Sequence, residues 1–289
     1  MNKNNVLITG GSGFIGSEVS KILLNKNYNL TILDIKKPNF TAKNLKFVKG
    51  SINNRKLIKK LIKKKNIVYH FAGIADIGEA SKLPVKTVEN NILATVNILN
   101  ECALNKINRF IFASTIYVHS DDGGFYKCSK KSCELYIQEF LKKSNLKFTI
   151  LRYGTIYGPS TNLKNNINKI VNCAIKSKKI IYEGKSIAKR KIIHCKDAAY
   201  AAVKVLEKKY ENKSVLITGN KNLKMKEILK KIKKKLDIKS KIIFQNKNLY
   251  GHYIHNPFSE KKIPYLKLKP KKQINIDQGI EEVINFLKH

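Results

Sequence analysis

The stretch Thr9-Gly-Gly-Ser-Gly-Phe-Ile-Gly16 follows the apolar run Val6–Thr9 and opens an amphipathic segment. In such a strand–turn–helix unit, Gly10 permits a tight turn, Gly13 lets a pyrophosphate approach the backbone, and Gly16 lets the helix pack closely on the strand. The free N–H groups and the positive potential at the helix N-terminus attract phosphate. The stretch therefore predicts the dinucleotide-binding start of a Rossmann-type fold.

An acidic residue at the end of the next predicted strand favours this interpretation over an ordinary turn without a ligand. Asp34 stands 18 residues after Gly16, where its carboxylate would accept hydrogen bonds from a ribose diol. The same carboxylate would repel a 2′-phosphate, so the sequence favours NAD as the cofactor. Lys36 and Lys37 could pair with such a phosphate, and NADP stays open as the less favoured alternative.

Short apolar runs alternate with amphipathic segments through the first two thirds of the chain. Strands are predicted at Val6–Thr9, Leu30–Asp34, Leu45–Val48, Ile67–Phe71, Arg109–Ala113 and Phe148–Arg152. Helices are predicted over 14–25, 53–65, 84–105 and 124–143. Such alternation gives βαβ units with right-handed crossovers. The predicted fold class is α/β: a Rossmann-type, doubly wound parallel sheet with helices on both faces and a smaller C-terminal substrate lobe.

The alternation loosens after residue 155. The further predicted elements are helices over 165–177 and 197–208, strands at Ile180–Glu183, Ile192–Ile193 and Val215–Thr218, and a mostly helical tail broken by Pro257, Pro264 and Pro270. We expect residues 1–155 to form the cofactor-binding domain, with 192–219 returning to it. Residues 156–191 and 220–289 are expected to form the substrate lobe.

Two residues one helical turn apart supply the candidate chemistry. Tyr126 and Lys130 fall on one face of the predicted helix 124–143. A phenol is a poor base at neutral pH because its pKa is about 10, and a neighbouring ammonium favours the phenolate and lowers that pKa. Thr115 follows the strand Arg109–Ala113, at the carboxyl edge where such sheets bind ligands. These three side chains are the predicted catalytic group, with Thr115 bonded to the reacting oxygen.

With these motifs in place, the chain resembles the extended short-chain dehydrogenase/reductases, specifically the NAD-dependent nucleotide-sugar epimerase/dehydratase family, along nearly its whole length. Five further stretches carry the resemblance: His70–Glu79, Glu89–Thr95, Leu151–Pro159, Arg190–Asp197 and Asp277–Gly279. The resemblance implies an enzyme that uses NAD and acts on a nucleotide-linked sugar.

The resemblance also implies which residues line the site. In the family, the loop after the fourth strand passes along the cofactor, and the backbone after the sixth strand lines the nicotinamide and the substrate. The candidate cofactor-binding residues are Gly10, Gly13, Phe14, Ile15, Gly16, Asp34, Ser51, Ile52, Phe71, Ala72, Gly73, Asn91, Tyr126, Lys130, Tyr153, Thr155 and Ile156. The candidate substrate-binding residues are Thr115, Thr155 and Arg190, the last because a guanidinium fork suits diphosphate oxygens.

Several reactions of the family stay open. Its dehydratases carry an Asp-Glu pair, and its decarboxylases a Glu, where this chain has Ile116 and Tyr117, so the carboxylates that loss of water needs are missing. The 70–79 stretch is similar to that of the UDP-glucose 4-epimerases. An epimerase that works at C4 through a keto-sugar is the leading hypothesis. An NAD(P)H-dependent keto-sugar reductase is the second, and a non-catalytic NAD-binding regulator is a distant third.

Three departures from the family's pattern concern the substrate pocket. Only ten residues separate Thr115 from Tyr126, where relatives usually carry a longer loop. Ser51 replaces an acidic residue that usually approaches the adenine, and Thr155 replaces an asparagine that usually meets the substrate phosphates. These changes leave the redox residues intact, whereas the nucleotide and the sugar stay open.

The net charge of +38 raises the question of a nucleic-acid partner, because clustered basic residues displace counterions from phosphate. Only four of the 58 basic residues are arginines, however, and the lysines are spread along the chain. Runs such as 56–65 place lysines on one helical face and apolar residues on the other. We therefore expect solvated helix faces and no specific nucleic-acid site.

Other features concern membranes, metals and location. No run of 18 apolar residues predicts a membrane helix, and the five cysteines form neither a C-x-x-C pair nor an obvious metal cluster, so no metal site is predicted. His70 and His194 are expected to pack or cap, and His252 and His255 lack a carboxylate cluster beside them. No signal peptide precedes Val6, so we expect a cytoplasmic protein, and we expect it to form a homodimer.

Overall fold

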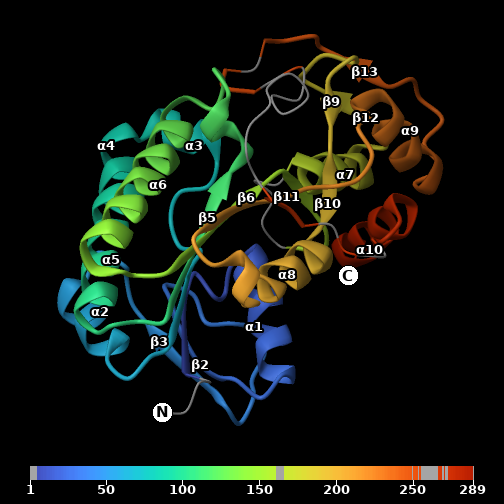
Figure 1. Cartoon of the computed structure of the whole chain (residues 1–289). Helices are drawn as coiled ribbons and strands as arrows, with labels where there is room; N and C mark the ends of the chain where they lie inside the picture. Colours follow the sequence, from blue (N-terminus) through green and yellow to red (C-terminus); the bar gives the residue numbers. More distant parts are fainter. Residues whose placement is uncertain are drawn as a thin grey trace.

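An eight-stranded parallel sheet forms the centre of the protein. The computed structural model describes residues 5–160, 166–248, 250–252, 254, 266–268, 270 and 273–288. The strands of the sheet are β1 (Asn5–Thr9), β2 (Asn29–Asp34), β3 (Leu45–Lys49), β4 (Ile67–His70), β5 (Arg109–Thr115), β6 (Phe148–Tyr153), β11 (Lys213–Ile217) and β14 (Leu266–Lys267). Their order is β14-β11-β6-β5-β4-β1-β2-β3, and each neighbouring pair is parallel (Figure 1). The predicted fold class is confirmed.

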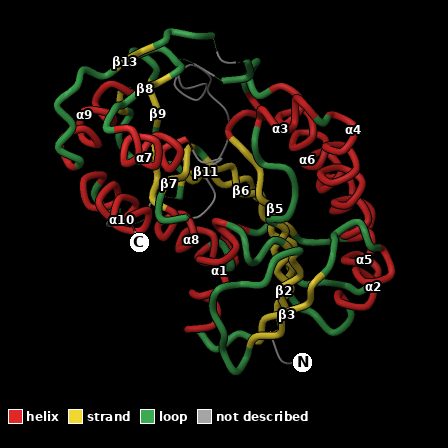
Figure 2. The backbone as a smooth tube through the Cα atoms, turned by 180° about the vertical axis from the view of Figure 1, so that it is seen from behind, coloured by secondary structure: helices red, strands yellow, loops and turns green. Residues whose placement is uncertain are grey.

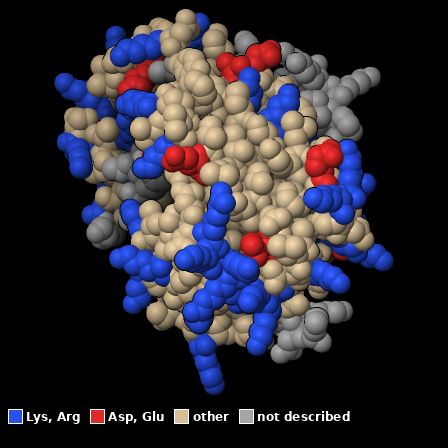
Figure 3. All heavy atoms as spheres, turned by 90° about the vertical axis from the view of Figure 1, so that its left-hand side faces the viewer, with Lys and Arg blue, Asp and Glu red and all other residues tan. Residues whose placement is uncertain are grey.

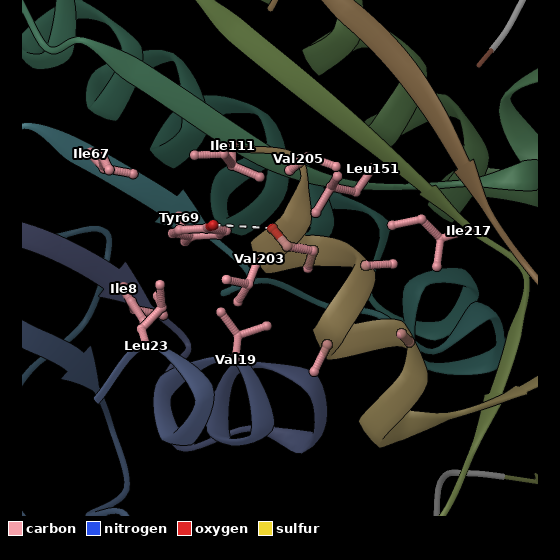
Figure 4. Packing of buried hydrophobic residues seen from close by; sticks show 14 of the residues in the cluster. Ile8, Val19, Leu23, Ile67, Tyr69, Ile111, Leu151, Val203, Val205 and Ile217 are labelled. Atoms are coloured by element: carbon pink, nitrogen blue, oxygen red, sulfur yellow. Dashed lines mark hydrogen bonds between the residues drawn. The ribbon is translucent and has the colours of Figure 1, made fainter. Parts of the chain in front are cut away.

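One face of the sheet is covered by α1 (Phe14–Asn25) and α8 (Cys195–Lys204). Apolar residues of α1 at helical spacing, among them Val19 and Leu23, pack on strand residues such as Ile8 (Figure 4). Tyr69 lies fully buried in this cluster, and its hydroxyl donates to the carbonyl of Ala202 in α8 at 3.0 Å. The packing places α8, which follows residue 192, against the sheet.

The other face carries α2 (Arg55–Ile62), α5 (Ala94–Leu104) and α6 (Gly124–Ser144), and Figure 2 shows helices on both sides of the strands. In α2, Ile58, Leu61 and Ile62 are buried and the lysines between them are exposed, which confirms the amphipathic interpretation of that run. The single helix predicted over 84–105 is instead α4 (Pro84–Thr87), a π-helical turn η1 (Val88–Leu93) and α5. The short helix α3 (Ile77–Lys82) was not predicted.

A separate apolar cluster, here called the lobe cluster, lies outside the sheet and joins α7 (Asn166–Ser177), α9 (Met225–Lys235) and α10 (Ile276–Lys288). Three pairs of short strands border it: β7 (Thr155–Tyr157) with β10 (Ile192–His194), β9 (Lys189–Arg190) with β12 (Leu223–Lys224), and β8 (Ile181–Tyr182) with β13 (Ile243–Phe244). Two 3-10 turns, η2 (Ile116–His119) and η3 (Lys208–Tyr210), complete the elements described. The proposed division into a cofactor domain and a substrate lobe stays a prediction. Tyr253, His255, Pro257 and Pro264 lie outside the described residues.

Within the described part of the chain, no helix combines the length and the apolar character that crossing a membrane requires. The five cysteines are all free, and Cys102, Cys133 and Cys195 are buried. His194 caps α8, because its side chain accepts from the backbone N–H of Lys196. The predicted capping role of this histidine is thus confirmed.

Candidate active site

The glycine turn joins β1 to α1 at the carboxyl edge of the sheet. Gly10 has a φ of 73°, in the region that favours glycine, and its N–H donates to the carbonyl of Leu33 at 3.0 Å. Gly13 is the N-cap of α1 and makes no side-chain cap, so the first N–H groups of the helix are available to a ligand. The turn thus has the backbone form that binds phosphate at a helix N-terminus.

The surroundings of Gly13 and Gly16 differ, as the sequence predicted. A Cβ on Gly16 would lie 2.1 Å from the carbonyl oxygen of Gly10, so this glycine is required for the contact between helix and turn. A Cβ on Gly13 would meet only that same oxygen, at 3.2 Å, and otherwise faces open space. The hydroxyl of Ser12 is buried and has no hydrogen-bond partner among the described residues. Open space, unbonded helix N–H groups and an unpaired hydroxyl fit a bound pyrophosphate.

Asp34 ends β2 beside this turn. One carboxylate oxygen accepts the N–H of Ser12 at 3.0 Å, and the other accepts the N–H of Lys36 at 3.1 Å. These bonds orient the carboxylate and leave its remaining lone pairs free for a ribose diol. Ser51 and Ile52 follow β3, whose last residue pairs with Asp34 across the sheet. The predicted ribose and adenine residues therefore lie on neighbouring strands.

The loop after β4 lies against the glycine turn. The N–H groups of Phe71 and Ala72 both donate to the carbonyl of Thr9, at 3.0 and 3.1 Å. Asn91, in the π-helical turn, accepts from the N–H of Ile74 at 2.7 Å and donates to the hydroxyl of Ser129 in α6 at 2.9 Å. Asn91 therefore ties the cofactor loop to the helix that carries Tyr126, a bracing role that the sequence did not reveal.

His70 is fully enclosed behind the turn and is not a candidate base. Its ring nitrogens bond the hydroxyls of Thr9 at 2.6 Å and Thr95 at 2.8 Å. Burial first, and then the charge of Lys130, lower the pKa of His70 to about 3, so the ring is neutral at physiological pH. The predicted packing role of this histidine is confirmed.

The three predicted catalytic residues come together at the carboxyl end of β5. Thr115 ends that strand, and its side chain hydrogen-bonds the phenol of Tyr126. Lys130 lies one turn further along α6, and its ammonium donates to the carbonyl of Ala113 at 2.8 Å. The ammonium also lies 4.7 Å from the centre of the Phe112 ring. A threonine, a phenol and an ammonium thus line one edge of the sheet, next to the glycine turn.

One expectation about this group is wrong. Burial raises the pKa of Tyr126 to about 12, and the hydrogen bond from Thr115 is the one effect that opposes it. Lys130 does not lower this pKa, because its ammonium is directed to the carbonyl of Ala113. The phenol is therefore protonated at neutral pH in this arrangement.

Residues beyond β6 lie where the substrate was expected. The ring of Tyr153 packs in the core under α8, so only its backbone reaches the edge of the sheet. Thr155 and Ile156 follow on β7 and pair with β10. Arg190 is buried on β9 and donates to the carbonyl of Lys189 at 2.9 Å. Burial first, and then the charge of Arg190, lower the pKa of His252. The binding roles of Thr155, Ile156 and Arg190 stay predictions.

The short loop before Tyr126 is covered by a distant part of the chain. Gly123 has a φ of 100°, and its N–H donates to the carbonyl of Gly251 at 2.9 Å. A Cβ on Gly124 would lie 2.9 Å from the ring of Tyr250. Residues 250 and 251 therefore occupy space beside the loop, and the adjacent glycines at 123 and 124 are the sequence signal for this contact.

Metal chemistry has no evident support in this part of the protein. Among the described residues, no group of three or more His, Cys, Asp or Glu side chains is placed to hold a metal ion.

Fold and site together define a dinucleotide-binding protein of the extended short-chain dehydrogenase/reductase class. The sequence matches the NAD dependent epimerase/dehydratase family over residues 6–218, and the chain belongs to that family. A putative UDP-glucose 4-epimerase of Methanocaldococcus jannaschii is 28% identical over 98% of each chain. A dTDP-D-glucose 4,6-dehydratase of Dictyostelium discoideum is 29% identical over 70% of this chain, and the match spans 55% of that longer protein.

Solved structures agree on the fold. The UDP-glucose 4-epimerase of Thermotoga maritima with UDP-glucose superposes with a TM-score of 0.84, at 19% identity over 98% of both chains. The UDP-glucuronic acid 4-epimerase of Bacillus cereus with UDP-glucuronic acid and NAD gives a TM-score of 0.83, at 22% identity over 98% of this chain and 99% of the other. The shared fold extends over the sheet and over the elements of the lobe cluster.

Proposed function

We propose that the protein is an NAD-dependent nucleotide-sugar epimerase that inverts C4 through a keto-sugar. One observation carries the proposal: Thr115, Tyr126 and Lys130 converge at the carboxyl edge of the sheet, beside a glycine turn whose helix N–H groups are free. The M. jannaschii relative, which carries the same proposed activity in its name, matches over nearly the full length of both chains.

The residues of the chain divide the work as follows. When bound, NAD would supply reversible hydride transfer at C4, and the glycine turn, Asp34 and Lys130 are the residues that would hold it. Tyr126 takes the proton of the C4 hydroxyl in its phenolate form, and the resulting phenol gives that proton back when the carbonyl is reduced. Thr115 holds the reacting oxygen, and Lys130 holds the nicotinamide ribose. Rotation of the keto-sugar between the two hydride transfers presents its other face, and inversion follows.

The residues at 116 and 117 bear on the competing reactions. Ile116 is buried, and Tyr117 packs with it and with Leu216, so no carboxylate is supplied there for loss of water. This favours epimerisation over the dehydratase activity named for the D. discoideum relative. A keto-sugar reductase needs the same three catalytic residues, and it stays the alternative. A non-catalytic regulator has no need of a Tyr126–Lys130 pair and is the weakest candidate.

The test is an assay by NMR over UDP-, dTDP-, GDP- and CDP-sugars, with and without added NADPH. We expect purified protein to release NAD(H) on denaturation and to interconvert C4 epimers with no net cofactor use. Product that appears only as NADPH is consumed would assign the protein to the reductases. A 4-keto-6-deoxy product would contradict the argument from residues 116 and 117.

NAD is the proposed cofactor in preference to NADP because Asp34 ends β2 beside the glycine turn, where its carboxylate could accept hydrogen bonds from a ribose diol and would repel a 2′-phosphate. Replacement of Asp34 with alanine should weaken NAD binding by about tenfold and narrow the difference between NAD and NADP, since a charged hydrogen bond contributes about 1.5–3 kcal/mol. Calorimetric titration of both cofactors measures this, with Asp121→Ala as a control at an exposed carboxylate. Tighter binding of NADP than of NAD by the unaltered protein would reverse the assignment and point to Lys36 and Lys37.

A homodimer is the proposed assembly. Five exposed apolar side chains lie on the outer surface of α4, η1 and α6: Val85, Val88, Leu93, Leu135 and Tyr136. Figure 3 views this side of the molecule and shows a largely uncharged upper area, with Lys and Arg gathered below it. In a chain of net charge +38, a second copy approaches most easily where charge is absent. The spread of lysines along the sequence also supports the proposal that the protein binds no specific nucleic acid. A cytoplasmic location is proposed as well.

A further inference from the structure

A buried ionic cluster lies directly under the catalytic edge. Arg152 of β6 donates to both carboxylate oxygens of Glu134 in α6, at 3.1 Å from Nε and 2.6 Å from Nη2. The hydroxyl of Ser114 donates to the same carboxylate at 2.5 Å. Exposure is only 3% for Ser114, 5% for Glu134 and 6% for Arg152. The cluster therefore joins two strands and one helix in an environment without solvent.

A buried ionic cluster of this kind contributes little to the free energy of unfolding. Removing two charges from water costs several kcal/mol, and well-packed apolar side chains in place of a buried ion pair are often as stable or more stable. The position of the cluster suggests another use. Ser114 precedes Thr115 on β5, and Glu134 lies one helical turn after Lys130 on α6. The cluster therefore touches the supports of two catalytic residues.

The groups around Lys130 determine the pKa of its ammonium, and Glu134 is one of them. Lys130 is 5% exposed, and burial lowers the pKa of its ammonium, whereas Cys133 and Glu134 act to raise it. Burial also raises the pKa of the Cys133 thiol, which is uncharged at neutral pH. His70, which faces Lys130 from β4, is neutral, and Tyr126 carries no charge at this pH. Among the described residues, Glu134 is thus the anionic group that acts on Lys130, and its own partner Arg152 is a cation.

We infer that Glu134 is a positioning residue for the catalytic edge: it carries a negative charge one helical turn from Lys130 in the same buried layer, and its bonds to Ser114 and Arg152 fix the end of β5 beneath Thr115. This inference rests on the proposed function for the use of Lys130 at the cofactor ribose. The charge of Glu134 is what acts on Lys130, and the bidentate bond to Arg152 holds that charge in place. The cluster thus prepares the site before any substrate binds.

Two variants separate charge from shape. Glu134→Gln keeps the size of the side chain and removes the charge, while Glu134→Asp keeps the charge and shortens the side chain. The titration midpoint of the Lys130 Nζ resonance is followed in protein labelled with ¹⁵N-lysine, with Lys130→Met used for assignment. In Glu134→Gln the midpoint should fall by about one pH unit or more, as expected for loss of a nearby opposite charge. In Glu134→Asp it should stay close to that of the unaltered protein.

A matched control comes from the other end of β5. There Arg109 pairs with Glu211 at 2.6 Å, remote from Lys130, so Glu211→Gln breaks a comparable ion pair. Glu211→Gln should lower the melting temperature and leave the Lys130 midpoint unchanged. A Glu134→Gln protein that melts lower but titrates normally would overturn the inference and make the cluster purely structural. If Glu134→Gln does not fold, the test rests on Glu134→Asp, which keeps the charge. A Lys130 midpoint that falls in Glu134→Asp would then contradict the inference.

The same variants are titrated with NAD across the pH range by calorimetry. Affinity should be lost as pH rises through the Lys130 midpoint, and that loss should begin at lower pH in Glu134→Gln. A shifted Nζ midpoint with no pH dependence of NAD affinity would support the role of Glu134 and contradict the proposed use of Lys130 at the ribose. The two proposals are therefore tested separately.

Discussion

Replacement of Tyr126 with phenylalanine should lower turnover by about 10²–10⁴-fold while NAD still binds, because general acid–base catalysis contributes about that factor. The ring of the substituted residue fills the same space under Thr115, whereas the hydroxyl that exchanges a proton with the sugar is lost. Lys130 keeps its bond to the carbonyl of Ala113, which does not involve the phenol. Cofactor binding is therefore expected to change little.

Steady-state kinetics on the sugar identified by the NMR panel and calorimetric titration of NAD measure the two effects. Tyr200→Phe is the matched control, since Tyr200 lies on α8 with 50% of its surface exposed and belongs neither to the site nor to the proposed dimer surface. It should behave as the unaltered protein does. Comparable turnover in Tyr126→Phe would remove this residue from the proposed mechanism.

The raised pKa of Tyr126 determines whether the resting protein is ready to oxidise the sugar hydroxyl or to reduce the keto-sugar. The pKa of Tyr126 is about 12, so the phenol holds its proton at neutral pH. The protonated phenol is the form needed to protonate a keto oxygen during reduction. Oxidation of a hydroxyl needs the phenolate instead. Additional positive charge beside the phenol would favour that form.

Much of the sheet was predictable because its central strands are buried on both faces and appear in the sequence as continuous apolar runs. Six strands, including the more exposed strand β3, were placed within about two residues of their observed ends, the usual scatter of such bounds. The two-residue strands β9, β12, β13 and β14 were missed, because two residues are too short for a recognisable pattern. The π-helical turn around Asn91 was also missed, because one extra residue in a turn hardly alters helical periodicity.

The parts of the site that depend on strand ends and helical spacing could be predicted from the sequence. The contacts between segments far apart in the sequence could not. Carboxyl ends of parallel strands share one edge, so Thr115 and the glycine turn had to lie on the same side of the sheet, and one strand, β4, separates them. Helical spacing placed Lys130 beside Tyr126. No local pattern links Glu134 to Arg152, which are bonded across an interface between α6 and β6, or Gly123 to Gly251. The pKa of Tyr126 was misjudged because it depends on burial, which spacing alone does not give.

Replacement of Gly16 and replacement of Gly13 with alanine should have different effects on stability and on NAD binding. In Gly16→Ala the new Cβ would lie 2.1 Å from the carbonyl oxygen of Gly10, so α1 and the turn must separate. Overpacking of this kind costs about 1–3 kcal/mol, more than the helix propensity that alanine gains over glycine. We expect a lower melting temperature together with loss of NAD binding.

Gly13→Ala should leave the fold unchanged and weaken NAD binding by about tenfold or more, because its Cβ would enter the space that a pyrophosphate needs. The backbone at Gly13, with a φ of −78°, accepts alanine without strain, and the nearest atom would be 3.2 Å away. Thermal melting and NAD titration are compared for both variants, with Gly78→Ala in α3 as a control for the change itself. Unchanged NAD affinity in Gly13→Ala would mean that the phosphates lie elsewhere, since the space beside Gly13 is the part of the turn that the protein itself leaves open.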